Sequence, residues 1–119
     1  IAAALPTSDL LRLYKTVEGL AMTALVEVHN RKELERVLGI NPKVIGINNR
    51  NLSDFSVSLE TTLELRSLIP NDKIVVSESG IHTRDDVKKL EQSGVNAILV
   101  GEALVKSADP SLKIRELIG

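Results

Sequence analysis

Short apolar runs alternate along this chain with longer stretches in which apolar residues recur every three or four positions. The runs are four or five residues long and mostly rich in Val and Ile, which predicts strands buried on both faces, as in a parallel sheet. The predicted strands are Ile1–Leu5, Ala24–Val28, Val44–Ile47, Ile74–Ser77 and Ala97–Val100.

The stretches between these runs carry signals for helices. Asn30 with Glu33 three residues later is a capping-box pattern, and Pro110 after Asp109 suits a first helical turn. The predicted helix starts are Thr7 or Ser8, Asn30, about Glu60, Thr83 and Asp109. Strand, helix and strand repeated with short connections are typical of right-handed βαβ units and a parallel sheet.

Two α/β architectures fit this repeat, an open doubly wound sheet and a (β/α)₈ TIM barrel. Polar residues follow every predicted strand, whereas an open sheet concentrates them at one switch point, so the pattern favours the barrel. A complete barrel needs about 250 residues. We therefore expect the 119 residues to form a single partial domain, the C-terminal half of a barrel.

Composition excludes several function classes. A net charge of −1 gives no electrostatic case for nucleic acid or an anionic membrane, and no apolar run is long enough to span a bilayer. The absence of cysteine excludes thiol catalysis and fits a reducing compartment. The two histidines form no metal-ligand pattern, and the common nucleotide-binding glycine motifs are missing.

Two acidic residues fall in or at the end of otherwise apolar strands. Glu27 and Glu78 are expected to face one barrel mouth, where paired carboxylates serve proton transfer or bind hydroxyls. The alternative for Glu27 is an ion pair with a neighbouring strand. His29 is more typical of a hydrogen-bonded structural residue or a helix cap.

Donors of hydrogen bonds follow the third predicted strand. Asn48 and Arg50 are candidates for fixing a substrate carboxylate or hydroxyl, although loop capping by Asn is an equal alternative. Asn49 and Asn51 are predicted to be turn residues.

Two neighbouring strand ends open into glycine. Backbone N–H groups at such ends are accessible to a phosphate because no side chain blocks them. The residues concerned are Ser79, Gly80, Gly101 and Glu102, the last expected to begin a short helix. A tight strand-to-helix turn would explain either glycine alone, so the argument depends on the pair.

Four strings carry a resemblance to a known family: Leu25–His29, Ile45–Leu52, Ser77–Ile81 and Leu99–Leu104. In this order and spacing they resemble indole-3-glycerol-phosphate synthase of tryptophan biosynthesis, over essentially the whole chain. The resemblance implies a cytoplasmic TIM-barrel lyase without cofactor or metal. It closes 1-(2-carboxyphenylamino)-1-deoxyribulose 5-phosphate to indole-3-glycerol phosphate, losing CO₂ and water. The chain would run from the end of strand four to helix eight.

The resemblance also assigns roles. Glu27 matches a glutamate of the family that is a candidate general acid/base. Asn48 matches an asparagine that orients the substrate, and Glu78 matches a glutamate near the substrate's hydroxyls. Arg50 takes a neighbouring substrate-side position. The implied phosphate clamp is Ser79, Gly80, Gly101 and Glu102, with Glu102 acting through its backbone N–H and its carboxylate turned away.

The family's essential lysines and a further glutamate belong to the half that this sequence lacks. The chain alone is therefore expected to be inactive, with either the missing N-terminal half-barrel or a second copy pairing with its exposed sheet edges. Two other readings stay open: a non-catalytic half-barrel unit, and another phosphate-binding barrel enzyme such as a phosphoribosyl isomerase.

Overall fold

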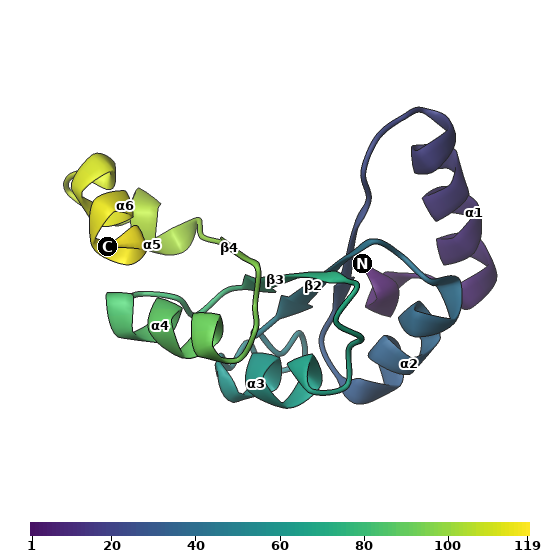
Figure 1. Cartoon of the computed structure of the whole chain (residues 1–119), viewed down its shortest axis with the longest axis horizontal. Coiled ribbons are helices and arrows are strands. Elements are labelled where there is room, and N and C mark those ends of the chain that lie inside the picture. Colours follow the sequence, from purple (N-terminus) through teal and green to yellow (C-terminus); the bar gives the residue numbers. More distant parts are fainter.

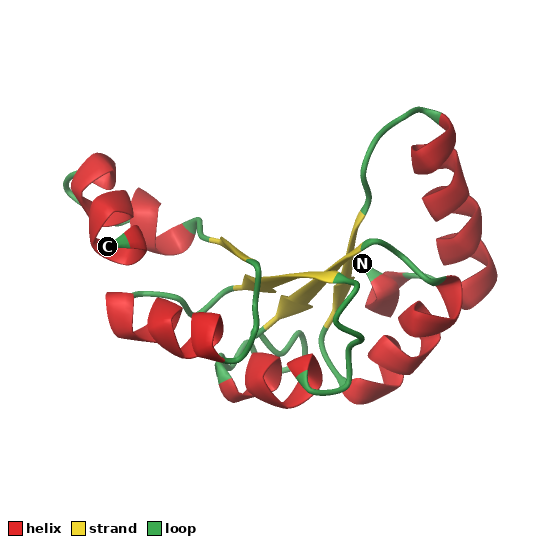
Figure 2. Ribbon diagram, viewed as in Figure 1, coloured by secondary structure: helices red, strands yellow, loops and turns green.

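The computed structural model describes residues 1–119 as one parallel sheet with helices (Figures 1 and 2). Its four strands lie in sequence order and all pair in parallel. They are β1 (Leu25–Val28), β2 (Val44–Asn48), β3 (Ile74–Glu78) and β4 (Ala97–Leu99). The helices are α1 (Thr7–Gly19), α2 (Arg31–Ile40), α3 (Glu60–Arg66), α4 (Arg84–Gln92), α5 (Glu102–Val105) and α6 (Pro110–Ile118).

Side-chain caps fix the starts of three helices. The Asn30 side chain accepts a hydrogen bond from the Glu33 amide, and Thr83 forms a full capping box with Asp86. Asp109 accepts from the two amides that follow Pro110. These caps satisfy N–H groups that the first helical turn leaves unpaired, which confirms the predicted starts.

The prediction of a strand over Ile1–Leu5 is wrong. The short 3₁₀ helix η1 (Ala2–Ala4) occupies this segment instead. Alanine has little preference for strands, and the carbonyls of Ala2 and Leu5 accept hydrogen bonds from the Arg36 guanidinium rather than from a neighbouring strand. The sheet therefore has four strands, not five.

Helices cover only one face of the sheet. Figure 1 shows α2, α3 and α4 on the same side, and the buried residues of the strands alternate accordingly. Val26, Val28, Ile45, Ile47 and Val75 are buried against these helices. We call this side the covered face.

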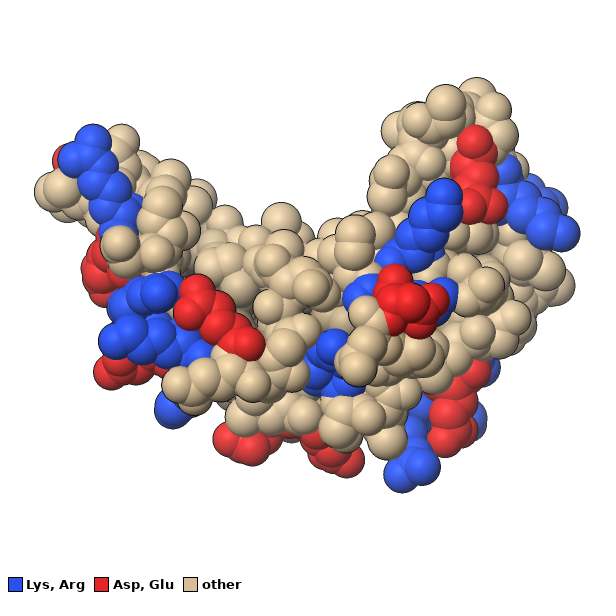
Figure 3. All heavy atoms as spheres, in the orientation of Figure 1, with Lys and Arg blue, Asp and Glu red and all other residues tan.

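The opposite side, here called the open face, carries no helix, so the expectation of strands buried on both faces is wrong for this chain. Leu25, Ile74 and Leu99 on it are 42%, 49% and 54% exposed. Figure 3 shows that the molecule is hollowed above the sheet, between α1 at one end and α5 with α6 at the other.

Candidate functional site

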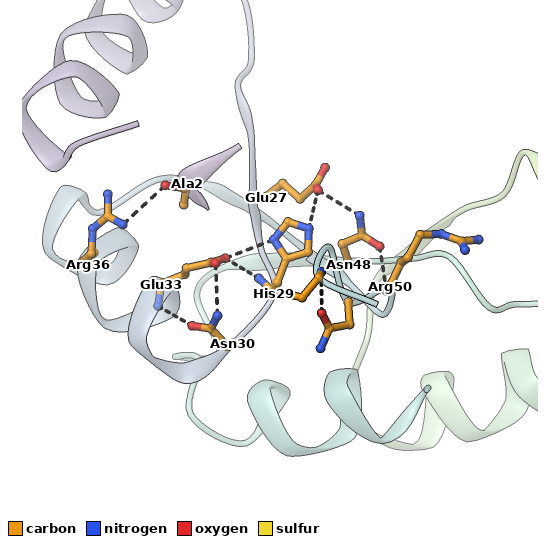
Figure 4. Close-up of polar contacts among 10 residues, drawn as sticks. Ala2, Glu27, His29, Asn30, Glu33, Arg36, Asn48 and Arg50 are labelled. Carbon is orange, nitrogen blue, oxygen red and sulfur yellow. Dashed lines mark hydrogen bonds and ion pairs between the residues drawn. The ribbon is translucent and has the colours of Figure 1, made fainter. Parts of the chain in front are cut away.

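The predicted catalytic side chains converge on the open face, at the carboxyl ends of the strands. Asn48 pairs in register with Glu78, and Glu27 pairs with Gly46. Because all strands run in parallel, their carboxyl ends meet at one edge, which brings residues more than 20 positions apart into contact. The side chain of Asn48 donates a hydrogen bond of 2.9 Å to Oε1 of Glu27 (Figure 4).

Glu27 is held from two sides. Besides Asn48, His29 brings its Nε2 to 3.1 Å from the same Oε1, an ion-pair distance without the alignment of a hydrogen bond. Asn48 is itself fixed, because its Oδ1 accepts from the Arg50 amide at 3.0 Å. The carboxylate of Glu27 therefore has a defined position on the open face.

His29 is a hydrogen-bonded structural residue, one of the two roles that the sequence predicts for it. Its side chain is only 6% exposed, and its Nδ1 lies 3.1 Å from Oε2 of Glu33. The same Oε2 accepts from the His29 amide at 2.7 Å, one residue earlier than a capping box would have it. The feature of the sequence that indicates this contact is Glu33, which lies four residues after His29 and brings its carboxylate to the imidazole (Figure 4).

Glu78 lies deepest among the predicted acids, at 5% exposure. Burial, followed by the negative charge of Glu27, raises the pKa of Glu78 to about 7, and the terminal amino group of Ile1 opposes this. Oε1 of Glu78 has no hydrogen-bond partner and lies over Gly46, where a Cβ would overlap it. Glycine at this position of β2 makes room for the carboxylate.

A cavity of about 420 Å³ lies at the carboxyl ends of β3 and β4, and Glu78 is among the residues that line it. Six of the eight predicted site residues line it: Arg50, Glu78, Ser79, Gly80, Gly101 and Glu102. Glu27 and Asn48 are not part of its lining, and Asn48 instead lines a second cavity of about 400 Å³ that shares Arg50 with the first. The two predicted phosphate-binding strand ends thus meet at one cavity.

The two glycines at the cavity differ in their surroundings. Gly80 has a φ of +74°, and a Cβ there would overlap the Val57 side chain. A Cβ on Gly101 would meet open space, and its φ of −121° suits any residue. Conformation therefore requires glycine at the end of β3 only.

Glu102 closes one rim of the cavity through its side chain. Its carboxylate lies 3.2 Å from the Arg50 guanidinium and 2.6 Å from Nζ of Lys106. The hydrogen bond and charge of Lys106, with a smaller contribution from Arg50, lower the pKa of Glu102. Arg50 is thereby held at the cavity by a residue 52 positions later in the chain.

No set of three or more His, Asp or Glu side chains is arranged to hold a metal ion. None of the helices is both long and apolar enough to cross a membrane.

Comparison with known proteins decides the family. The family model described as Indole-3-glycerol phosphate synthase matches residues 1–117. The chain belongs to the indole-3-glycerol phosphate synthase family. The resemblance read from its strand ends is thus confirmed.

Indole-3-glycerol phosphate synthases of named organisms align along nearly the whole chain. The protein of Albidiferax ferrireducens is 50% identical over 98% of this chain and 44% of its own length. That of Trichodesmium erythraeum is 53% identical over 98% and 41%, and that of Dehalococcoides mccartyi 51% over 99% and 46%. The chain thus spans less than half the length of these relatives.

Solved structures support the fold. A 3-hexulose-6-phosphate synthase superposes with a TM-score of 0.72 at 14% identity, over 94% of this chain and 56% of its own. The Amycolatopsis orientalis BexX/CysO complex contains a chain with a TM-score of 0.69 at 17% identity, of which 46% is covered. At such identities the likeness concerns the fold alone. With the family assignment it confirms the predicted class, the C-terminal half of a TIM barrel.

Proposed function

We propose that this chain supplies the phosphate site and part of the catalytic site of an indole-3-glycerol-phosphate synthase, a decarboxylating carbon–carbon lyase. The substrate would be 1-(2-carboxyphenylamino)-1-deoxyribulose 5-phosphate, and the products indole-3-glycerol phosphate, CO₂ and water. One observation carries the proposal: Glu27, Asn48 and Glu78 share the open face, and Glu78 lines a cavity together with both glycine-bearing strand ends.

The reaction asks for groups that hold and move protons. Ring closure forms a carbon–carbon bond, after which the ring carboxylate leaves as CO₂ and a hydroxyl leaves as water, taking a proton from an acid. We assign acid/base work to Glu27, whose position is fixed by Asn48. Glu78, with its pKa of about 7, can either donate to or accept from the substrate's hydroxyls near neutral pH.

The phosphate would bind in the cavity at the other end of the substrate. Ser79, Gly80 and Gly101 offer backbone N–H groups there, and Arg50 offers a guanidinium. Glu102 would contribute its N–H, since its carboxylate is paired with Arg50 and Lys106.

The same proposal makes the chain incomplete. The single domain would run from the end of barrel strand four to helix eight, and the family's essential lysines would lie on the half that covers the open face. That half, rather than a second copy, is the proposed partner, because it would both pair the free edges of β1 and β4 and complete the catalytic set. A cytoplasmic location accords with a chain without cysteine.

Activity assays of the isolated chain test this proposal. We expect no turnover from residues 1–119 alone and restored turnover when the complementary half of a relative is added. Turnover by the chain alone would contradict the claim of incompleteness. A stable 13.0 kDa monomer on size-exclusion chromatography would count against the need for a partner.

Binding distinguishes the reaction from that of other phosphate-binding barrels. Indole-3-glycerol phosphate should shift the amide NMR signals of Ser79, Gly80 and Gly101, and those of Asn48 and Glu78 as well. A phosphoribosyl compound that shifts all five signals more strongly would favour the isomerase alternative instead.

A further inference from the structure

Asn49 was expected to be a turn residue, yet it is among the most deeply buried polar groups of the chain, at 2% exposure. Its Oδ1 accepts from the amide and the hydroxyl of Thr62, at 3.1 and 2.7 Å. Its Nδ2 donates to Oγ of Ser77 and to the carbonyl of Ser79, both at 3.0 Å. The whole hydrogen-bonding capacity of the amide is used, and the backbone partners fix which atom is oxygen.

The backbone of Asn49 reaches the same strand end. Its N–H donates to the carbonyl of Glu78 at 2.8 Å. Asn49 therefore binds two successive carbonyls, those of Glu78 and Ser79, and is not itself among the residues that line the cavity.

These two bonds determine where the next two amides point. In a trans peptide the C=O and the following N–H point in opposite directions. Holding the Glu78 and Ser79 carbonyls toward Asn49 thus directs the N–H groups of Ser79 and Gly80 the other way. Neither N–H donates to any group of the chain, and both residues line the cavity of about 420 Å³.

The conformation held in this way is not one that serine favours. Ser79 has a φ of +67°, in the left-handed region, where a non-glycine residue costs roughly 1 kcal/mol or more and persists only if its surroundings impose it. The bond from Asn49 to the Ser79 carbonyl is the side-chain contact that does so.

We propose that Asn49 is a positioning residue that aims the Ser79 and Gly80 amides into the cavity, where they bind the oxygens of a phosphate group. This rests on the phosphate site proposed above, and adds to it the residue that shapes the site without touching the ligand.

The test compares Asn49→Ala with Ser77→Ala and Thr62→Val in the 119-residue chain, with inorganic phosphate as the probe. All three lose hydrogen bonds of one buried network, including the 2.8 Å contact between the Thr62 and Ser77 hydroxyls. Only the first releases the Ser79 carbonyl. We expect phosphate affinity to fall about tenfold or more in Asn49→Ala, as for loss of a hydrogen bond to a charged group. It should change less than about twofold in the two controls, whose stability falls comparably.

One further measurement distinguishes failure of the phosphate site from failure of the role of Asn49. The ¹³C shifts of Ser79 report its φ without any ligand, and they should leave the left-handed range in Asn49→Ala alone. If wild-type chain binds no phosphate but this shift occurs, the phosphate site fails and the positioning role stands. Unchanged Ser79 shifts, or equal loss of phosphate affinity in all three variants, would overturn the role of Asn49.

Asn49→Asp serves if the alanine variant does not fold. Its ionised carboxylate cannot donate to the Ser79 carbonyl, whereas the protonated acid can. Phosphate affinity relative to wild type at the same pH should therefore recover as the pH is lowered from 8 to 5. The other ionisable side chains at the cavity, those of Arg50, Glu78, His82 and Glu102, are common to both proteins. A ratio that does not change with pH would overturn the proposal.

Discussion

The two faces of the sheet are built from the same four strands, yet they differ in how deeply their apolar side chains are buried and in how their polar groups are paired. On the covered face, the apolar side chains of β1, β2 and β3 are buried, and the polar Asn49 and Ser77 form hydrogen bonds with each other and with Thr62 of α3. On the open face, apolar side chains are half exposed, and the buried Glu78 keeps an oxygen without a partner. The covered face has the burial and the satisfied hydrogen bonds of a protein core, whereas the open face leaves apolar surface exposed and a buried carboxylate oxygen unpaired.

The difference arises because successive side chains of a strand point to opposite faces of the sheet. Ile45 and Ile47 of β2 pack against helices, while Gly46 and Asn48 between and after them form the site. Stability and chemistry are thus assigned to alternate residues, so substitutions on the two faces should have separable effects.

The largest effect is expected from removing the buried apolar bulk. Ile47→Ala should lower the free energy of unfolding by about 2–5 kcal/mol, because a fully buried side chain leaves a cavity. Leu99→Ala, at a side chain 54% exposed, should cost less than about 1 kcal/mol. Urea unfolding measures both. Equal losses would mean that the open face is covered in solution, as by a second copy.

Filling the space over Gly46 should have the next largest effect. A methyl group there overlaps Glu78, so Gly46→Ala should cost about 1–3 kcal/mol and push the carboxylate toward water. The pKa of Glu78 should then fall toward its ordinary value, which ¹³C titration of the carboxyl group follows. Gly101→Ala, which adds its methyl group to open space, is the matched control. An unchanged Glu78 titration would show that the carboxylate does not need this space.

Titration of Glu78 should also show in the stability of the chain. Its pKa is raised from 4.5 to about 7, so between these values the folded state binds more protons than the unfolded state. Stability due to this group is full below about pH 4.5 and is lost as pH rises through 7, at no more than about 1.4 kcal/mol per pH unit.

Glu27→Gln sharpens this third prediction by removing only the charge. The pKa of Glu78 should fall but stay above 4.5, because burial is the larger cause and remains. The free energy of unfolding should accordingly decline over a narrower range of pH, from about 4.5 to the lowered pKa of Glu78. A Glu78 titration identical to wild type would remove Glu27 as a cause, and with it the physical coupling of the two acids.

Much of this arrangement was predictable because it follows from local pattern and parallel topology. The apolar runs predicted β1 to β4. The capping residues Asn30, Thr83 and Asp109 predicted where three helices begin. Parallel strands then bring Glu27, Asn48 and Glu78 to one edge of the sheet. The run Ile1–Leu5 misled because its apolarity comes from alanine, and because only tertiary structure shows that Arg36 takes its carbonyls.

The role of Asn49 could not be read from the sequence for a different reason. Its neighbours Asn48 and Asn51 belong to the same residue type, and only the path of the segment from Ser58 to Thr62 buries one of the three. That path brings the Thr62 amide and hydroxyl onto Oδ1. No residue type or spacing along the chain indicates that the segment from Ser58 to Thr62 packs onto Asn49.

The smallest effect is expected at the rim where the two faces meet solvent. Glu102→Gln removes a carboxylate that is paired with Arg50 and Lys106 but is 48% exposed, so the midpoint of unfolding should hardly move. Phosphate affinity should rise about twofold, because a like charge leaves the cavity and Arg50 is released. Glu35→Gln removes a paired carboxylate on α2 that is 65% exposed and does not line the cavity, and it should leave affinity unchanged. A fall in affinity in Glu102→Gln alone would mean that the ion pair holds Arg50 in place for the ligand rather than competing with it.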